Sequence, residues 1–191
     1  MEHRSTVSST VKLYTFTGPS GSGKNTIVRA VLKARPDLWF VPSVTTRKRR
    51  PSDIPGEYKF ISLGEFEQRE QNGEFFESIT FGGNRYGTLK RDLERVFTRD
   101  GESIIILTPD AVPLFRAYTP AVRSFYIMGP ERDVLRRRLR ERGDAAAAIE
   151  RCLAESASWN RCAIQSGDFD VFIRNDGTVQ EAVSSVIAQM K

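Results

Sequence analysis

Short apolar runs alternate with longer amphipathic stretches along most of this chain. The apolar runs are bounded by turn residues and are typical of strands buried on both faces of a sheet. We predict strands at residues 11–17, 103–108, 124–128 and 170–174, and helices at residues 27–33, 89–98, 110–118, 131–142, 144–163 and 178–191. This alternation favours a parallel sheet joined by right-handed crossovers.

Residues 39–88 follow a different pattern. Residues 38–44 and 57–61 read as short extended segments, and residues 74–88 as two more around a glycine-rich turn. Ser62 stands three residues before Glu65, which predicts a capping box at the start of a helix reaching about residue 71. We interpret residues 39–88 as a small insertion on a larger α/β body.

The loop between the first strand and the first helix reads Gly18-Pro-Ser-Gly-Ser-Gly-Lys24-Asn25-Thr26. Strand, glycine loop and helix form the context of a phosphate-binding P-loop, in which backbone N–H groups and the helix N-terminus face the phosphates. The residue after the lysine is normally Ser or Thr and holds magnesium, so here either Asn25 or Thr26 is the candidate ligand. The expected nucleotide-phosphate contacts are Gly18, Ser20, Gly21, Ser22, Gly23, Lys24, Asn25 and Thr26.

The net charge of +5 and the pI near 9.4 indicate anionic partners. The cations concentrate at residues 47–50 and 136–142, and a P-loop beside them favours small phosphorylated molecules over nucleic acid. His3 is the only histidine, and Cys152 and Cys162 lack partners at metal-ligand spacing, which excludes histidine-dependent nucleophiles and histidine metal sites. No apolar run is long enough to span a membrane and no signal peptide is visible, so we expect a cytoplasmic protein.

Several further motifs follow the P-loop in order. They are Ser43-Val-Thr-Thr-Arg47 with Arg50, Tyr58, Phe75-Phe-Glu77, Tyr86-Gly-Thr88, Arg138-Leu with Arg142-Gly, and Asn175-Asp. With these motifs the chain resembles the guanylate kinase family over about residues 11–190. The resemblance implies an α/β P-loop kinase that uses Mg²⁺ and moves the γ-phosphate of ATP to GMP, as a monomer or homodimer. It also implies a parallel five-stranded core sheet flanked by helices (about 11–38, 89–137 and 160–191), a mixed α/β GMP-binding insertion (about 39–88) and a helical lid (about 138–159).

The resemblance also assigns roles to individual residues. It gives the GMP phosphate to Arg47 and Arg50, with Tyr58 and Tyr86, and bidentate arginines suit a phosphate dianion. It gives guanine to Glu77, Ser43 and Thr88, since a carboxylate can accept both N1–H and N2–H₂. Lys24, Arg138 and Arg142 would meet the transferring phosphoryl group. The alternatives without a functional role are a solvated basic loop around residue 47 and surface salt bridges from Arg138 and Arg142 to Glu131 and Glu141.

Three positions depart from the family pattern. Thr108 replaces the first residue of an aspartate-x-aspartate pair, which leaves Asp110 as the remaining contact to guanine or metal-bound water. Cys152 replaces a lid arginine and Trp159 a glutamate. These departures keep two alternatives open: a ribose 1,5-bisphosphate kinase of the same fold, and a non-catalytic interaction module. The intact P-loop speaks against the module, and Glu77 against the sugar bisphosphate.

Overall fold

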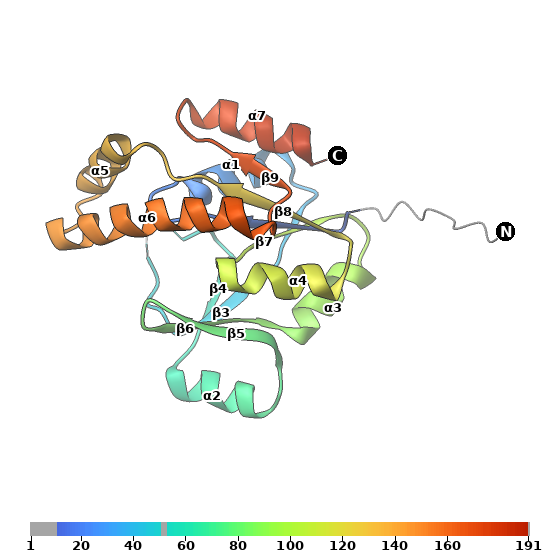
Figure 1. Cartoon of the computed structure of the whole chain (residues 1–191). Coiled ribbons are helices and arrows are strands. Elements are labelled where there is room, and N and C mark those ends of the chain that lie inside the picture. The colour runs from blue at the N-terminus through green and yellow to red at the C-terminus, as the bar shows by residue number, and fades with distance from the viewer. Residues whose placement is uncertain (1–10, 51–52, 191) are drawn as a thin grey trace.

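A five-stranded parallel sheet forms the centre of the molecule, as predicted (Figure 1). The computed structural model describes residues 11–50 and 53–190, so His3 and residues 51–52 of an expected turn lie outside it. The strand order is β2-β7-β1-β8-β9. The strands are β1 (Leu13–Thr17), β2 (Trp39–Phe40), β7 (Ser103–Ile106), β8 (Val122–Ile127) and β9 (Val171–Ile173).

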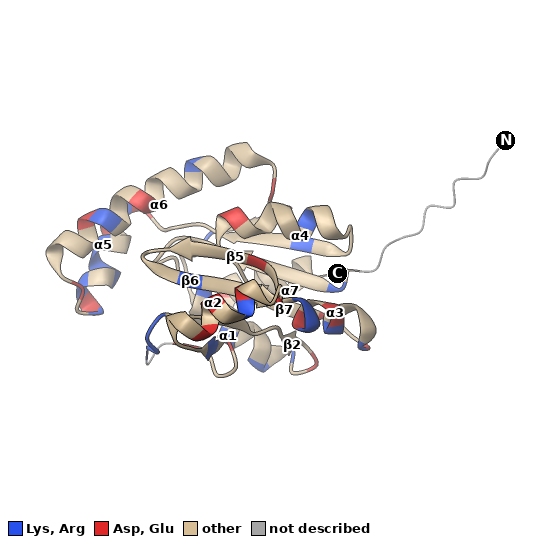
Figure 2. Ribbon diagram, turned by 90° about the horizontal axis from the view of Figure 1, so that it is seen from below, with Lys and Arg blue, Asp and Glu red and all other residues tan. Residues whose placement is uncertain are grey.

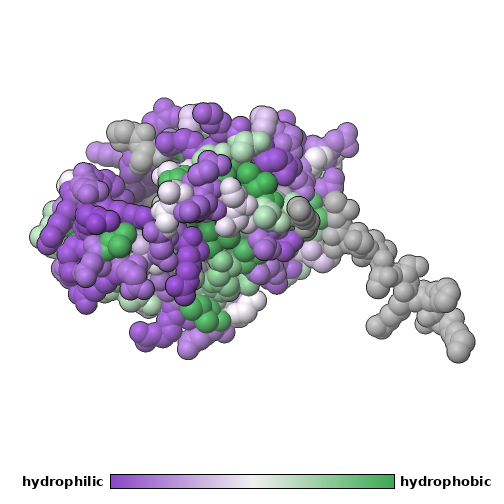
Figure 3. Space-filling model, turned by 90° about the horizontal axis from the view of Figure 1, so that it is seen from above, coloured by the Kyte–Doolittle hydropathy of each residue, from purple (hydrophilic) through white to green (hydrophobic). Residues whose placement is uncertain are grey.

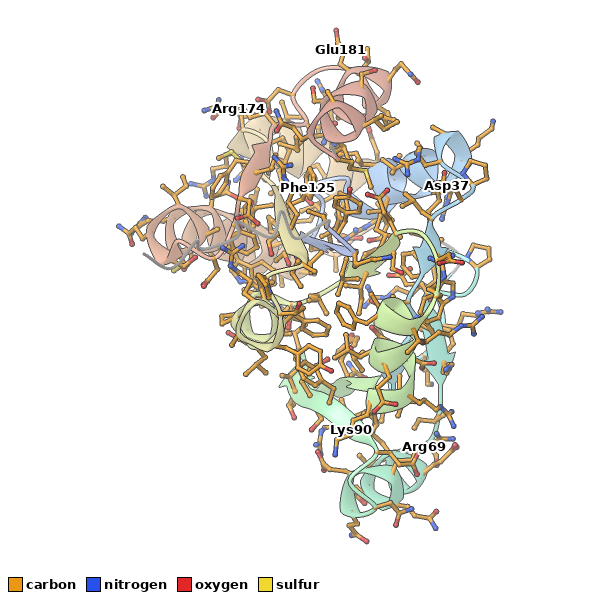
Figure 4. All side chains as sticks on the ribbon, turned by 90° about the vertical axis from the view of Figure 1, so that its right-hand side faces the viewer. Asp37, Arg69, Lys90, Phe125, Arg174 and Glu181 are labelled. Carbon is orange, nitrogen blue, oxygen red and sulfur yellow. The ribbon has the colours of Figure 1, made fainter. Side chains whose placement is uncertain are left out.

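Helices cover both faces of this sheet, which explains why its strands are apolar on both sides. One face packs against α1 (Lys24–Ala34) and α7 (Val179–Gln189), and Phe125 of β8 lies in that layer (Figure 4). The other face packs against α3 (Lys90–Thr98), α4 (Val112–Tyr118) and the end of α6 (Ala146–Ser166). A short 3₁₀ turn, η1 (Pro109–Ala111), precedes α4.

Residues 43–89 build a second, four-stranded sheet in the order β4-β3-β6-β5 (Figure 1). Helix α2 covers it by stacking Phe66 on Phe75, with ring centroids 4.4 Å apart. The strand β2, at the predicted start of the insertion, pairs with β7 of the larger sheet. The elements are β3 (Ser43–Thr45), β4 (Tyr58–Phe60), α2 (Leu63–Gln71), β5 (Phe75–Phe81) and β6 (Asn84–Leu89).

Helix α5 (Arg132–Glu141) and the first part of α6 project beyond the larger sheet (Figure 1). They pack against each other through an apolar cluster of Leu135, Leu139, Ile149 and Leu153. Arg residues recur along the ribbon of α5 (Figure 2), and the surface over it is mostly hydrophilic (Figure 3). Within the described residues, no helix has both the length and the apolar character that a membrane crossing requires.

The N-termini of α2 and α7 are both capped by a side chain, but only α7 has a full capping box. Thr178 and Glu181 form a full capping box at α7, with Glu181 N donating to Thr178 Oγ1 at 3.2 Å and Thr178 N donating to Glu181 Oε2 at 2.8 Å. Ser62 caps α2 by accepting from Glu65 N at 3.1 Å. The Glu65 carboxylate, however, pairs with Arg69 at 2.9 Å. The predicted capping box at α2 is therefore only half formed.

Candidate active site

A cavity of about 490 Å³ lies where the P-loop, the smaller sheet and α5 meet. Residues from widely separated motifs line it, as the predicted site requires. Most of the predicted site residues line the cavity: Gly18, Ser20, Gly21, Gly23, Lys24, Asn25, Thr26, Ser43, Arg47, Arg50, Tyr58, Glu77, Tyr86, Arg138 and Arg142. Three predicted site residues do not line it, namely Ser22, Thr88 and Asp110.

The P-loop, residues 18–26, is fixed from the end of β9. Asn175 donates from Nδ2 to the carbonyl of Ser22 at 2.8 Å, and both residues are buried. Gly23 has φ 86°, and a Cβ there would lie 2.2 Å from Asn175 Nδ2. The glycine therefore allows both the left-handed backbone and the close approach of Asn175. Ser22 itself is buried and does not line the cavity.

Lys24 begins α1 and points into the cavity region from the P-loop. Burial lowers the pKa of its ammonium group, and the carboxylate of Glu57 opposes that shift. Glu57 is 2% exposed and accepts hydrogen bonds from Ile54 N at 2.9 Å and from Asn25 Nδ2 at 3.4 Å. Sequence reasoning missed Glu57, because a glutamate at the edge of a short strand carries no local signal of contact with a helix 32 residues earlier.

Asn25 and Thr26 both line the cavity, and Thr26 is exposed. The described residues contain no group of three or more His, Cys, Asp or Glu side chains that could hold a metal ion. Magnesium needs no such cage beside a nucleotide, because it keeps water and phosphate ligands and takes only one or two from the protein. The amide oxygen of Asn25 and the hydroxyl of Thr26 therefore fit Mg²⁺ as oxygen ligands.

Arg47 and Arg50 are brought together by Asp53, a residue without a predicted role. Arg47 is buried and pairs with Asp53 through Nη2 to Oδ1 at 2.8 Å, and the backbone N of Arg50 donates to Asp53 Oδ2 at 2.7 Å. The Arg47 guanidinium also lies 4.9 Å from the ring centre of Tyr58. The basic loop is thus built around one buried ion pair. Lys48 and Arg49 are exposed, as expected for the solvated part of such a loop.

Glu77 lies on β5 and is 8% exposed. Thr88 of β6 donates from its hydroxyl to Glu77 Oε1 at 2.8 Å, while Glu77 Oε2 is buried without a partner among the described residues. Burial raises the pKa of Glu77 to about 7, against the opposing effect of the hydrogen bonds from Thr88. Thr88 therefore stands behind Glu77 instead of lining the cavity, and Ser43 lines it from β3.

Arg138 and Arg142 reach the cavity from α5 and the residue after it. Arg138 donates to the carbonyl of Asn175 at 3.0 Å, and Arg142 Nε donates to Asp144 Oδ1 at 2.8 Å. Their partners in the structure are thus Asn175 and Asp144, and the expected alternative partners Glu131 and Glu141 are both exposed.

Asp110 does not reach the cavity. It is exposed on the 3₁₀ turn η1, where Pro109 follows directly after Thr108. Thr108 itself lines the cavity, and its buried hydroxyl has no partner among the described residues. Asp110 is therefore not placed in this structure to make the expected contact with guanine or metal-bound water. Of the two residues, only Thr108 lines the cavity.

Comparison with known proteins assigns this arrangement to a family. A family model described as guanylate kinase matches residues 10–191. Guanylate kinases of Trichormus variabilis and Symbiobacterium thermophilum are 38% and 37% identical, each over 86% of this chain and over 82% and 77% of their own lengths. A crystal structure of guanylate kinase from Anaplasma phagocytophilum superposes with a TM-score of 0.70 at 23% identity, covering 95% of this chain and 84% of that one. The chain belongs to the guanylate kinase family.

Proposed function

We propose that this chain transfers the γ-phosphoryl group of ATP to GMP and releases ADP and GDP. One observation carries the proposal: a single cavity holds a P-loop lysine, a pair of arginines beside two tyrosines, and a buried carboxyl with one unpartnered oxygen. Similar chains carry the name guanylate kinase. A binding module would have no use for the intact P-loop.

The donor side of the cavity suits ATP. Backbone N–H groups of the P-loop and the N-terminus of α1 would hold the phosphates, and Lys24 adds a compact positive charge. Mg²⁺, held by Asn25 or Thr26, would neutralise charge on the phosphate oxygens. Arg138 and Arg142 enter from α5 and would stabilise the charge on the transferring group.

The acceptor side suits GMP. Arg47, Arg50, Tyr58 and Tyr86 would bind its phosphate, with Asp53 orienting the Arg47 guanidinium and holding the backbone at Arg50. In its ionised form Glu77 would accept hydrogen bonds from guanine N1–H and N2–H₂.

A phosphate oxygen of GMP then bonds to the γ-phosphorus of ATP, and the bond from that phosphorus to the bridging oxygen breaks, so the electron pair leaves with ADP. Little covalent chemistry is asked of the protein beyond positioning and charge. Both substrates are dissolved nucleotides, which agrees with the proposed cytoplasmic location.

The test is an ADP-release assay of the purified chain with ATP and Mg²⁺, with GMP, dGMP, AMP, UMP and ribose 1,5-bisphosphate offered in separate reactions. We expect turnover of GMP and dGMP. Ribose 1,5-bisphosphate is included because Trp159 and Asn25 depart from the guanylate kinase pattern, and turnover of it alone would overturn the proposal. The absence of ADP release with every acceptor would favour a non-catalytic role.

A further inference from the structure

An aromatic row connects α6 to the basic loop along one wall of the cavity. Trp159 of α6 meets Phe81 edge to face, with ring centroids 5.5 Å apart. Phe81 lies 6.5 Å from Tyr86, and Tyr86 lies 6.1 Å from Tyr58, which in turn lies under the Arg47 guanidinium. All five residues line the cavity. Trp159 is therefore the end of a wall that includes the proposed phosphate-binding tyrosines.

Phe81 shares its strand with Glu77. Side chains two residues apart on a strand face the same way, and Glu77, Ile79 and Phe81 of β5 all line the cavity. Gly82 and Gly83 follow with φ 55° and 75° and turn the chain into β6, where Tyr86 pairs with Ile79. A contact at Phe81 therefore acts on the β5–β6 hairpin that carries both Glu77 and Tyr86.

The part of α6 that bears Trp159 is tied to the larger sheet. Asn160, the next residue, accepts hydrogen bonds at Oδ1 from Tyr126 OH at 3.2 Å and from Gly129 N at 3.1 Å. Its Nδ2 donates to the Gly129 carbonyl at 3.3 Å. Since Tyr126 is fully buried in β8, this segment of the helix has a fixed position. Trp159 can thus serve as a fixed point for the hairpin.

We infer that Trp159 is a positioning residue for the phosphate acceptor: through Phe81 it holds the cavity face of the β5–β6 hairpin, with Glu77 and Tyr86, against the anchored segment of α6. The inference rests on the proposed function, because it takes GMP as the acceptor. It assigns a role to a residue at which this chain departs from the family pattern. Phe81, 39% exposed, is the side chain through which the effect travels.

Substitution kinetics test this role. Trp159→Ala should raise KM for GMP about three- to tenfold, the range expected for an aromatic pair, with KM for ATP changed by less than about twofold. Trp159→Phe should restore most of the loss. Trp39→Ala is the matched control, because Trp39 of β2 packs against Arg95 of α3 and does not line the cavity. An unchanged KM for GMP in Trp159→Ala, or an equal rise in both KM values, would overturn the inference.

Coupling between the two rings gives a second kinetic readout. If Trp159 acts through Phe81, the double variant Trp159→Ala with Phe81→Leu should have nearly the KM for GMP of the worse single variant. Strictly additive effects would contradict this route.

Fluorescence gives a readout independent of turnover. The chain has 2 tryptophans, so Trp39→Phe leaves Trp159 as the sole tryptophan. We expect its emission to change on titration with GMP in the absence of ATP. No change, in a variant that turns over GMP with wild-type KM, would contradict the inference. Wild-type turnover of GMP is measured first, so that failure of the proposed function is recognised separately.

Discussion

The hydroxyl of Thr88 donates to one carboxyl oxygen of Glu77 at 2.8 Å, and the other oxygen of Glu77 is buried with no partner among the described residues. A buried polar atom without a partner is costly, and such an atom in a cavity wall is suited to bind a ligand group. The fold thus uses Thr88 to orient Glu77 and leaves Oε2 for the acceptor.

Binding of GMP should depend on pH through Glu77. Its pKa is raised to about 7, and only the ionised carboxylate can accept both guanine donors. KM for GMP should therefore fall as pH rises from about 6 to about 8, whereas Glu77→Gln should have a higher and nearly pH-independent KM. Steady-state kinetics across this range is the measurement. A wild-type KM for GMP that is flat with pH would contradict this assignment.

Glu77 should also affect stability with a defined sign. Its folded-state pKa lies above the unfolded value, so the folded state binds the proton more tightly and loses stability as pH rises from about 4.5 to about 7. Glu77→Gln should consequently gain stability relative to the parent at pH 8 compared with pH 5. Urea unfolding at both pH values checks this, and a difference of the opposite sign would exclude a raised pKa.

Lys24→Ala should abolish phosphoryl transfer while leaving the fold intact, because Lys24 is the P-loop cation in the cavity. Lys48→Ala is the control, since Lys48 is an exposed member of the basic loop and should keep normal kinetics. The ADP-release assay and circular dichroism of both variants decide the question. Near-normal activity of Lys24→Ala would contradict a role of the P-loop in phosphoryl transfer.

Asp53→Asn should weaken both stability and GMP binding. It removes the partner of the buried Arg47, and leaving one member of a buried ion pair alone typically costs about 3 kcal/mol. KM for GMP should rise about tenfold, because the Arg47 guanidinium loses its orientation and the backbone at Arg50 loses its hydrogen bond. Asp37→Asn is the control, because Asp37 pairs with Arg35 at an exposed site and should cost less than about 1 kcal/mol. Equal costs in urea unfolding would contradict the buried pair.

Thr178→Ala should lower the free energy of unfolding by about 1 kcal/mol without changing kinetics, because it removes a helix cap whose two residues do not line the cavity. Ser62→Ala should cost less, since only half of a capping box exists at α2. Urea unfolding of both variants measures the difference, and the reverse order would be inconsistent with the two caps.

Local patterns made the larger sheet and the P-loop predictable. Apolar runs and turn residues identify buried strands from a few neighbours, and the glycine–lysine spacing is itself a short motif. The reach of Arg47 toward Asp53 is nearly as local, yet it was missed, because a short loop segment does not indicate which carboxylate turns inward.

Long-range contacts account for most of what sequence reasoning could not supply. Asn25 meets Glu57 and Trp159 meets Phe81 only because two sheets and α6 converge on one cavity. Thr88 was expected to contact guanine, and in the structure its hydroxyl donates to Glu77, because pairing of β5 with β6 places the two residues opposite each other. Asp110 was expected in the site, but the 3₁₀ turn that begins at Pro109 leaves it exposed.

Recognition of guanine by Glu77 is tested most directly by the ratio of kcat/KM for GMP to that for AMP in the purified wild-type chain. Adenine presents an acceptor at N1, where guanine presents a donor, so the ionised Glu77 carboxylate would be left unpaired. We predict a preference for GMP of about 10⁴ or more, as expected for a site built to pair with specific donor groups. A ratio near one would contradict recognition of guanine by Glu77 and, with it, the proposed function.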